Sequence, residues 1–509
     1  MTPLHRNLGR VIDRAADPQR VAFIGLDAEG GAVELRYGAL DARADAIARS
    51  LRALGHPPGE RIALLGANSM DYVAALLGIL RAGLVAVPVN FKLPQALVDF
   101  VLKDSGAQRV LCDADRSALV PDDLPRHVFG TPSFEALATA HADDAHCAPF
   151  DPGADDEAML LYTSGSTGRP KGVRLSHASH RWVVEARRIA TPVDQERLLI
   201  AAPLYHMNAL ALVLLALASH ATAVLLPQFT ARAYIGAIDR FRCTWLTAVP
   251  PMIAMMLREH EALADADLSC VRVVRMGSAP VSPGLLTQIE RLLPGARVIN
   301  AYGTTEGGPV VFRAHPQGLP TPPQAVGVPH PQVDVRLVDA AGHEVPPGEE
   351  GELQLRSAGM MLGYHGRPEL QPFTPDGYYA TGDIFRRDAQ GFHTFVGRRD
   401  DMFVSGGENL YPGDIEKALE RHPAVQQASV IPVPDEIKGT KPVAFVVLRD
   451  GAADPGEAAL KAFSLQHLAT YQHPRRIWCV DALPLAATQK IDRRALADQA
   501  QRRLARQQP

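Results

Sequence analysis

Residues 162–172, Tyr-Thr-Ser-Gly-Ser-Thr-Gly-Arg-Pro-Lys-Gly, constrain this chain more than any other segment. Glycines let backbone N–H groups approach phosphate oxygens closely, the hydroxyls add neutral donors, and Lys171 adds a point charge. The G-x-x-x-x-G-K-[ST] spacing of a Walker A loop is absent. Because residues 160–162 form an apolar run typical of a buried strand, we interpret the segment as a strand leading into a polyphosphate-binding loop, rather than as a flexible Gly/Ser linker.

Four further motifs follow downstream, at residues 300–306 (Asn-Ala-Tyr-Gly-Thr-Thr-Glu), 379–383 (Tyr-Ala-Thr-Gly-Asp), 397–409 and 488–494 (Thr-Gln-Lys-Ile-Asp-Arg-Arg). Taken in this order, the five motifs resemble those of the adenylate-forming superfamily of acyl-CoA synthetases, luciferases and peptide-synthetase adenylation domains. The resemblance covers nearly the whole chain. It is strongest to bacterial aryl- and acyl-CoA ligases of the 4-chlorobenzoate–CoA ligase kind.

The size and charge of the chain narrow its class. A length of 509 residues with 47% hydrophobic residues is ample for a large core and at least two domains. A net charge of -4 argues against a nucleic-acid partner, which would require a basic surface. The five cysteines show no C-x-x-C spacing, so we expect reduced thiols in a cytoplasmic protein.

No membrane segment is expected. Residues 1–6 lack the apolar stretch of a signal peptide. The most apolar segment, 209–226, is interrupted by Ser219, His220 and Thr222. It predicts a buried helix followed by a core strand rather than a transmembrane span.

The hydrophobic pattern predicts an α/β fold, with a large N-terminal domain of layered α/β subdomains plus a small β unit, followed by a small α+β C-terminal domain, which the resemblance implies is mobile. Helices are expected at 40–54, 69–82, 412–422 and 457–469, and strands at 61–65, 85–89, 425–433 and 442–449. We predict a connection at 142–157, strand–helix alternation over 200–310, irregular chain at 311–332 and short strands over 333–396. The resemblance places the domain boundary at Arg399-Asp400, giving domains 1–399 and 400–509.

The resemblance implies two half-reactions: ATP and a carboxylate give an acyl-adenylate and pyrophosphate, and the thiol of coenzyme A then displaces AMP. Charge stabilisation is the main requirement of both. The residues expected to bind ATP or AMP are Thr163, Ser164, Gly165, Ser166, Thr167, Gly168, Lys171, Ser278, Ala279, Pro280, Ala301, Tyr302, Gly303, Thr304, Asp383 and Arg398. Glu306, with Thr163, is expected to ligate Mg²⁺, which prefers oxygen ligands.

Three of these residues also have a plain structural interpretation. Tyr302 is expected to stack on adenine, but it could equally be a core tyrosine. Asp383 and Arg398 are expected to bind the ribose, whereas Asp beside Gly commonly caps a turn. Glu306 could merely cap the turn at 307–308.

Lys490 is the expected adenylation residue, by resemblance, because it would neutralise charge between the carboxylate and the α-phosphate. Gln489 stands where Gly is common in the family. The alternative for Lys490 is that it is only a solvated charge in a basic run. By resemblance the C-terminal domain rotates between the half-reactions about a hinge at Asp400. The residues then expected near CoA are Ser405, Gly406, Gly407, Glu408, Lys438 and Arg475.

His206 is expected beside the acid, because residues 203–208 match the family segment that carries a gating aromatic residue or histidine. The other expected pocket residues are Asn208, Thr247, Ser278, Gly303, Gly308 and Pro309, with Trp182 or its neighbours. The segment has no Asp for an ammonium group, which argues against an amino-acid substrate. No Arg or Lys stands out to pair with a second carboxylate, so we expect a monocarboxylic acid, aromatic or short and branched.

Such an acid could carry a hydroxyl held by Asn208 and His206, although Asn208 could equally bond only the local backbone. Two rival functions stay open. One is an adenylation enzyme that loads a separate carrier protein, and the other is a non-catalytic binding protein that retains the fold. A homodimer is expected only by analogy with the family.

Overall fold

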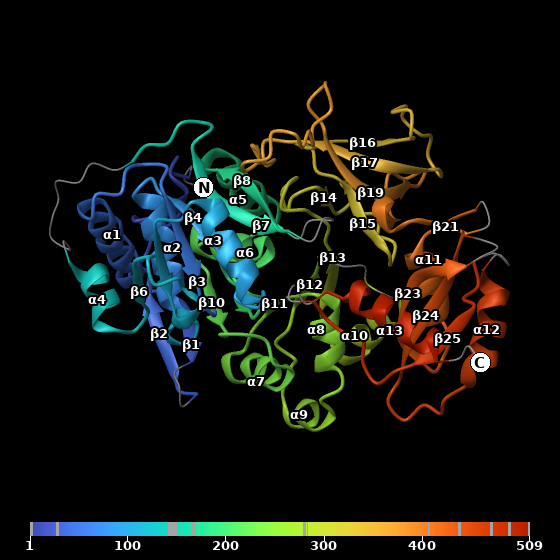
Figure 1. The fold of residues 1–509 in the computed structure, drawn as a ribbon. Helices are drawn as coiled ribbons and strands as arrows, with labels where there is room; N and C mark the ends of the chain where they lie inside the picture. Colours follow the sequence, from blue (N-terminus) through green and yellow to red (C-terminus); the bar gives the residue numbers. More distant parts are fainter. Residues whose placement is uncertain are drawn as a thin grey trace.

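The computed structural model describes residues 4–26, 30–140, 150–163, 169–277, 281, 283–405, 408–435, 439–468, 472–486 and 490–506. Within these ranges the chain forms two seven-stranded sheets, a six-stranded sheet and two small C-terminal sheets. Figure 1 shows the two large sheets in the blue-to-green part, the six-stranded sheet in yellow and orange beside it, and the C-terminal elements in red. The fold is mixed α/β, with a large N-terminal and a small C-terminal domain, as the sequence predicts.

The first sheet contains the strands that end nearest the candidate site. Its strands, in spatial order, are β13 (Arg297–Asn300), β12 (Val273–Met276), β11 (Trp245–Ala248), β9 (Arg197–Ile200), β10 (Thr222–Leu225), β1 (Val21–Leu26) and β2 (Ala32–Arg36). All except β2 are parallel. The associated helices are α6 (Met207–Ala218), α7 (Ala231–Phe241), α8 (Pro250–Met256), α9 (His260–Asp265) and α10 (Pro283–Leu292). Parallel pairing brings the carboxyl ends of β11, β12 and β13 to one edge.

The second sheet positions the two ends of the phosphate motif. Its strands, in order, are β6 (Arg126–Val128), β5 (Arg109–Cys112), β3 (Arg61–Leu65), β4 (Val85–Pro88), β7 (Glu157–Thr163), β8 (Lys171–Ser176) and β18 (Gly363–Tyr364). Its helices are α1 (Tyr37–Ala53), α2 (Met70–Arg81), α3 (Gln95–Ser105), α4 (Pro132–Thr139) and α5 (His177–Ala190), with 3₁₀ turns η1 (Leu8–Arg10) and η2 (Ala114–Leu119). Antiparallel β7 and β8 place Thr163 opposite Lys171.

The third sheet is antiparallel and begins earlier in the chain than expected. Its strands, in order, are β14 (Phe312–Arg313), β15 (Ala325–Pro329), β20 (His393–Arg398), β19 (Tyr379–Arg387), β17 (Glu350–Arg356) and β16 (Asp334–Val338). The prediction of irregular chain over 311–332 is therefore wrong for β14 and β15. Gly327, with φ of 111°, lets the two backbones approach, since a Cβ there would lie 2.2 Å from the Arg313 carbonyl oxygen.

The C-terminal elements form a small unit with its own apolar core. They are η3 (Arg399–Asp401), β21 (Phe403–Ser405), β22 (Glu408–Leu410), α11 (Pro412–Glu420), β23 (Val425–Asp435), β24 (Gly439–Leu448), α12 (Gly456–His467), β25 (Arg476–Cys479) and α13 (Arg493–Ala505). The unit touches the larger part where Arg258 donates to the Gln426 side chain at 2.6 Å and Lys417 donates to the Phe395 carbonyl at 3.2 Å. The proposed boundary at Arg399-Asp400 lies within η3.

The apolar periodicity explains most of the observed elements. The predicted strand at 61–65 matches β3 residue for residue, and the segment 209–226 is buried helix α6 followed by strand β10. The helices α1 and α2 pack so closely that a Cβ at Gly78 would lie 2.5 Å from the Ile47 side chain. None of the helices in the described ranges has the length and apolarity needed to cross a bilayer.

The cysteines of the described ranges carry free thiols. Cys112 and Cys243 are buried, Cys270 and Cys479 are half-buried, and Cys147 lies outside the described residues. Burial raises the pKa of Cys112 to about 11 and that of Cys243 to about 12. These two thiols are therefore protonated and unreactive at neutral pH, as expected of core cysteines.

Three buried histidines make the fold sensitive to acid. Burial lowers the pKa of His177, His180 and His393 to about 4. Unfolding returns each to about 6.5, so the unfolded chain binds more protons between pH 4 and 6.5. The stabilisation from the neutral histidines is then complete above pH 6.5 and falls as the pH drops, by up to about 1.4 kcal/mol per pH unit for each histidine. We expect the Tm to fall by several degrees between pH 7 and pH 5 in a thermal scan.

The variant His393→Asn cannot take up this proton, and its Tm should depend less on pH than that of the parent. His260→Asn, at an exposed histidine, is the matched control and should retain the parent's pH dependence. A Tm that is unchanged or rises between pH 7 and pH 5 would contradict the assignment of these histidines as neutral.

Candidate active site

The phosphate side of the candidate site joins the second sheet to the segment after β13. Thr163, the last residue of β7, donates from its hydroxyl to Glu306 Oε1 at 3.3 Å. Tyr364, on β18, donates to the same oxygen at 3.2 Å. Lys171 Nζ lies 4.8 Å from the centre of the Tyr364 ring, and among the described residues it has no carboxylate partner. A carboxylate, a hydroxyl and a cation therefore gather at the ends of the phosphate loop.

Several predicted phosphate and nucleotide residues cannot be placed. They lie outside the described residues and are Ser164, Gly165, Ser166, Thr167, Gly168, Ser278, Ala279 and Pro280. The strands on either side define where the first five must connect, because β7 and β8 are paired up to Thr163 and Lys171. The roles assigned to these residues stay predictions.

The structure brings Tyr302, Asp383 and Arg398 together. Tyr302 donates from its hydroxyl to Asp383 Oδ2 at 2.5 Å, and Arg398 Nη1 lies 3.0 Å from Asp383 Oδ1. Strands β19 and β20 place Asp383 directly opposite Arg398. Burial raises the pKa of the Asp383 carboxyl, while the charge of Arg398 and the Tyr302 hydroxyl oppose that shift. Both oxygens of Asp383 are engaged in these contacts rather than in capping the turn at Gly382.

The Tyr302 ring has aromatic neighbours. Its centre lies 4.9 Å from that of Phe385, at nearly a right angle, and 5.9 Å from that of Phe312. Tyr302 thus combines a packed ring with a hydroxyl directed at Asp383. Burial raises the pKa of the Tyr302 hydroxyl well above its ordinary value, so it donates a hydrogen bond throughout the neutral range.

The turn after β13 explains where Glu306 points. Thr304 Oγ1 accepts the N–H of Gly307 at 2.8 Å, so the Glu306 carboxylate is not needed as a cap and is directed at Thr163 and Tyr364 instead. The turn is tight: a Cβ at Gly303 would lie 2.6 Å from the Pro309 backbone, and Gly308 has a φ of 84°. Ala301 donates from its N–H to the Met276 carbonyl at 2.7 Å, which fixes the start of the turn on β12.

Lys490 reaches this region from the C-terminal unit. The charge of Lys490 influences the pKa values of Asp383 and His206. The carboxylates of Asp383 and Glu306 in turn influence the pKa of Lys490. Partial burial within the site lowers the pKa of Lys490, and Asp383 is the largest influence that raises it. The residue nevertheless stays accessible to solvent. Gln489, its unusual neighbour, lies outside the described residues.

His206 precedes α6 and is a neutral imidazole. Burial, with smaller effects of the charges on Lys490 and Lys92, lowers the pKa of His206 to about 4. Its buried Nε2 has no hydrogen-bond partner among the described residues. An unpaired ring nitrogen at the start of α6 can donate to or accept from a ligand, depending on the tautomer.

The remaining acid-pocket residues border two arginines that the sequence analysis did not identify. Asn208 Oδ1 accepts from Arg275 Nη1 at 3.2 Å, and Arg275 pairs in register with Thr247 on the neighbouring strand. Arg187, on α5, is buried and lies near enough to Arg275 for the two charges to repel. One signal was available, namely a charged residue inside the apolar strand Val-Val-Arg-Met. Trp182 packs beside them against Val310.

Of the residues predicted to bind CoA, the structure describes the side chains of Ser405 and Arg475, and it shows no contact between them and the other described site residues. Ser405 ends β21 and is buried, with a hydroxyl that has no partner among the described residues, and Arg475 contacts the ring of His473 at 3.0 Å. Gly406, Gly407 and Lys438 and the Glu408 side chain lie outside the described residues. No described contact links Ser405 or Arg475 to Glu306 or Asp383. The predicted hinge residue, Asp400, is exposed, 3.9 Å from Arg398.

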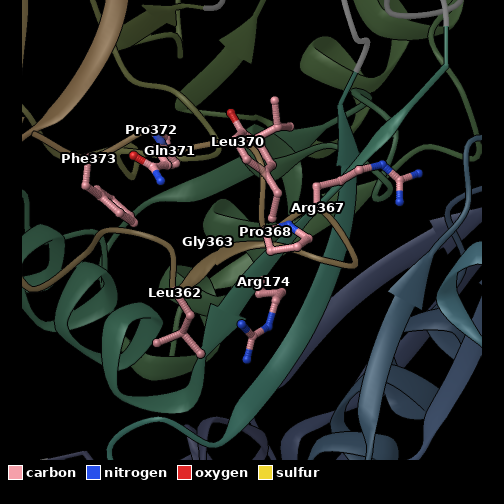
Figure 2. A pocket seen from close by; sticks show the side chains of 10 residues that line it. Arg174, Leu362, Gly363, Arg367, Pro368, Leu370, Gln371, Pro372 and Phe373 are labelled. Carbon is pink, nitrogen blue, oxygen red and sulfur yellow. The ribbon is translucent and has the colours of Figure 1, made fainter.

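A separate hollow lies on the surface beside β18. Its volume is about 360 Å³, and it is lined by Arg174, Leu362, Gly363, Tyr364, Arg367, Pro368, Leu370, Gln371, Pro372 and Phe373. Figure 2 shows Phe373 and Arg367 at opposite ends of it. Both of its arginines already have carboxylate partners, Glu157 for Arg174 and Asp104 for Arg367. The hollow shares only Tyr364 with the contacts described above, so we do not assign the chemistry to it.

The oxygen donors of Glu306 and Thr163 suit a hard cation only if a bound ligand supplies further oxygen atoms. Glu306 and Thr163 offer a carboxylate and a hydroxyl oxygen 3.3 Å apart, which fits Mg²⁺ that keeps waters and phosphate oxygens in its shell. The described ranges contain no group of three or more His, Cys, Asp or Glu that could hold a metal by themselves. The residues therefore fit a metal that arrives with a polyphosphate.

The sequence of this chain matches two family profiles and the sequences of known CoA ligases. The family profile of AMP-binding enzymes matches residues 12–365, and that of the AMP-binding enzyme C-terminal domain matches residues 414–490. A feruloyl-CoA synthase of Amycolatopsis sp is 37% identical over 91% of this chain and 93% of its own length. A sulfoacetate–CoA ligase of Cupriavidus necator is 32% identical over 92% of each chain.

Solved structures agree with these sequence matches. ATP-bound MatB from Rhodopseudomonas palustris superposes with a TM-score of 0.87 at 28% identity, covering 97% of this chain and 99% of that one. The anthranilate CoA ligase AuaEII, in complex with anthranoyl-AMP, superposes with a TM-score of 0.86 at 27% identity, covering 98% and 99%. These neighbours hold a nucleotide and an acyl-adenylate respectively.

The contacts of Tyr302 and Asp383 lead to a prediction about ATP binding. Tyr302→Phe removes the hydroxyl bond to Asp383 but keeps the ring, so the KM for ATP should rise about fivefold with little change in kcat. Asp383→Asn also weakens the pair with Arg398, and the KM should rise about tenfold or more. Initial rates of pyrophosphate release at varied ATP concentration measure both effects.

Tyr378→Phe is the matched control, because that ring packs under Arg336 at 4.0 Å, away from Asp383. It should leave the KM for ATP unchanged. An unaltered KM in both Tyr302→Phe and Asp383→Asn would contradict the assignment of these residues to the nucleoside.

Proposed function

Because the chain belongs to the family of AMP-binding enzymes, and within it to the AMP-forming acid–thiol ligases, we propose that it is an ATP-dependent carboxylate–CoA ligase. It would convert a carboxylic acid to an acyl-adenylate and then to an acyl-CoA thioester. The observation that carries the proposal is the convergence of Glu306 with Thr163, of Asp383 with Arg398, and of Lys490 with both carboxylates.

In the adenylation step the acid's carboxylate oxygen attacks the α-phosphorus of ATP, and pyrophosphate leaves. Asp383 and Arg398 would bind the ribose, and the face of Tyr302 would lie against adenine. Lys490 would sit between the attacking carboxylate and the α-phosphate, where its charge offsets the repulsion of two anions. His206, neutral at the pH of the reaction, would close the acid side without adding charge.

Lys171 and the loop 164–168 would hold the β- and γ-phosphates, and Glu306 with Thr163 would hold Mg²⁺. When bound, the metal would neutralise phosphate charge. The contact of Tyr364 with Glu306 orients the carboxylate toward Thr163 before any ligand arrives.

For the second half-reaction we propose that the C-terminal domain, residues 400–509, rotates about Asp400. The thiol of CoA then attacks the acyl carbon and AMP leaves. Support comes from the position of Lys490 near Asp383 and Glu306, while Ser405 and Arg475 make no contact with the described residues of the site. Gly406, Gly407, Glu408 and Lys438 would complete the CoA side.

We propose a small carboxylic acid as substrate, with an aromatic or a short, branched body as predicted from the sequence. Gly303, Gly308 and Pro309 leave little side-chain bulk near the reacting group. Similar proteins are named a feruloyl-CoA synthase and a sulfoacetate–CoA ligase, so the names alone do not identify the acid that this chain uses. A cytoplasmic location and a homodimer are proposed by analogy only.

The proposal is tested by measuring pyrophosphate release from ATP and Mg²⁺ across a panel of carboxylic acids, with and without CoA. We expect release to depend on a particular acid, with AMP and an acyl-CoA formed only when CoA is present. Release that yields only a bound adenylate would favour a carrier protein as the acceptor. No release with any acid would contradict the enzymatic proposal.

In the same assay, Lys490→Ala should lower the rate of adenylate formation by roughly 10²–10³-fold, the usual cost of removing one transition-state charge partner. Lys461→Ala, at a lysine of the same domain that pairs with Glu457 at 2.8 Å, is the control and should behave as the parent. Equal rates for Lys490→Ala and the parent would refute the proposed mechanism.

The hinge makes a separate prediction. Asp400 is the middle residue of the 3₁₀ turn η3, where the fixed φ of proline is tolerated. Asp400→Pro should therefore keep adenylate formation but slow the CoA-dependent step by about tenfold or more, because the backbone can no longer rotate there. Asp400→Ala should keep both steps. Single-turnover measurement of each half-reaction decides, and a parallel loss of both would contradict the hinge.

A further inference from the structure

Arg187 is a buried cation that lacks an internal counter-charge in the described structure. It lies on α5 with 8% of its surface exposed, and its buried Nη1 has no hydrogen-bond partner among the described residues. Burial, followed by the charge of Arg275, lowers the pKa of Arg187 well below its ordinary value. No carboxylate of the described chain counteracts that shift.

Arg275, on β12, is a second cation without an internal counter-charge in the described structure, and it is half-buried. Its Nη1 donates to Asn208 Oδ1 at 3.2 Å, which is a neutral acceptor, and burial lowers the pKa of Arg275 to about 10. No ion pair joins it to any described carboxylate. Two guanidinium groups that repel each other thus lie close together. The Asn208 amide oxygen, which is uncharged, is the one acceptor that the described residues offer them.

The protein pairs another buried arginine in the usual way. Arg81 has only 1% of its side chain exposed, and it lies 2.6 Å from Asp41 and 2.9 Å from Asp45. A buried charge without such a partner is strongly unfavourable. The missing carboxylates beside Arg187 and Arg275 therefore require an explanation that the folded chain does not itself supply.

The two arginines border the acid side of the site. Asn208 lies two residues after His206 on α6, and Thr247 is the register partner of Arg275 on β11. Ala186, the neighbour of Arg187, packs against Val310, which follows Pro309 in the predicted acid pocket. The Asn208 amide nitrogen and the Thr247 hydroxyl are also buried without partners. The unsatisfied groups on these elements are mainly hydrogen-bond donors.

We propose that Arg187 and Arg275, with Asn208 and Thr247, bind a second anionic group of the substrate, a carboxylate or sulfonate remote from the carboxylate that reacts. This inference rests on the proposed ligase function and names its substrate class. A guanidinium matches both oxyanions through paired N–H donors. It reverses the sequence-based expectation that a dicarboxylate is disfavoured, which assumed that no Arg or Lys faced the pocket.

The test compares matched acids in the pyrophosphate assay: terephthalate against its monoamide, succinate against its monoamide, and sulfoacetate against acetate. The parent should prefer the dianionic member of at least one pair by about tenfold or more in kcat/KM. Arg275→Met and Arg187→Met should remove that preference while turnover of the monoanionic partner persists. Equal use of both members, or a preference for the monoanionic member, would overturn the inference and leave the ligase proposal intact.

Arg272→Met is the matched control, because Arg272 lies one residue before β12 on the surface and pairs with Glu196 at 2.8 Å. It should retain the parent's preference. Arg275→Lys should retain part of it, because a lysine keeps the charge but not the paired donors.

Thermal stability gives a second readout that does not depend on turnover. If the arginines lack an internal anion, Arg187→Met should raise the Tm of the ligand-free protein by about 2 °C or more. A carboxylate hidden elsewhere in the chain would instead be left unpaired, and the Tm would fall, which would overturn the inference. Should no acid be turned over, terephthalate, succinate or sulfoacetate must still raise the Tm of the parent but not that of Arg275→Met, or the inference fails.

Discussion

Two side chains of the segment 300–309 hold the site together across three sheets. The segment follows β13 of the first sheet. Glu306 accepts from Thr163 of the second sheet and from Tyr364 of β18, and Tyr302 donates to Asp383 of the third. The backbone of the segment takes part as well, because the Glu306 carbonyl accepts the Met361 N–H at 2.8 Å. Groups that are far apart in the sequence thereby acquire fixed positions relative to one another, which catalysis by charge placement requires.

Charge is distributed differently on the two sides of this segment. On the proposed nucleotide side, Asp383 pairs with Arg398, and the charge of Lys490 lies near Asp383 and Glu306, so these charges have opposites within the protein. On the acid side, Arg187 and Arg275 stand without a described carboxylate. The first arrangement is balanced without substrate, whereas the second would be completed by the substrate anion that we propose. A binding site whose charges are unpaired without substrate lowers the stability of the folded protein, but it favours substrates of the opposite charge.

Much of the architecture was predictable because it follows from local pattern. Apolar runs bounded by Gly and polar residues located β3, α2, α6 and β10 to within a few residues. The strand β14 was missed because two residues carry no periodicity, and β15 was missed because it contains Gly327 and Pro329, which are typical of irregular chain; β14 pairs with β15, and β15 pairs with β20. Sequence position likewise could not show that the buried Arg187 and the half-buried Arg275 are neighbours, since they come from a helix and a strand 88 residues apart in numbering. The motif residues Thr163, Glu306, Tyr302 and Asp383 were found by resemblance, but their mutual contacts required the structure.

The position of Lys490 connects the charge balance to the proposed movement of the C-terminal domain. While Lys490 is at the site, it favours an anion between itself and Arg398 and helps to keep His206 neutral. On rotation that positive charge would leave, and the same pocket would hold the phosphate of AMP less strongly. The acyl carbon would meanwhile stay fixed by its own substituents. A second anionic group held by Arg187 and Arg275 would be unaffected by the rotation, because both arginines belong to the N-terminal domain. Such an anchor would let the nucleotide side loosen for AMP release without freeing the acyl group, which explains why the two sides of one site would be built on different electrostatic principles.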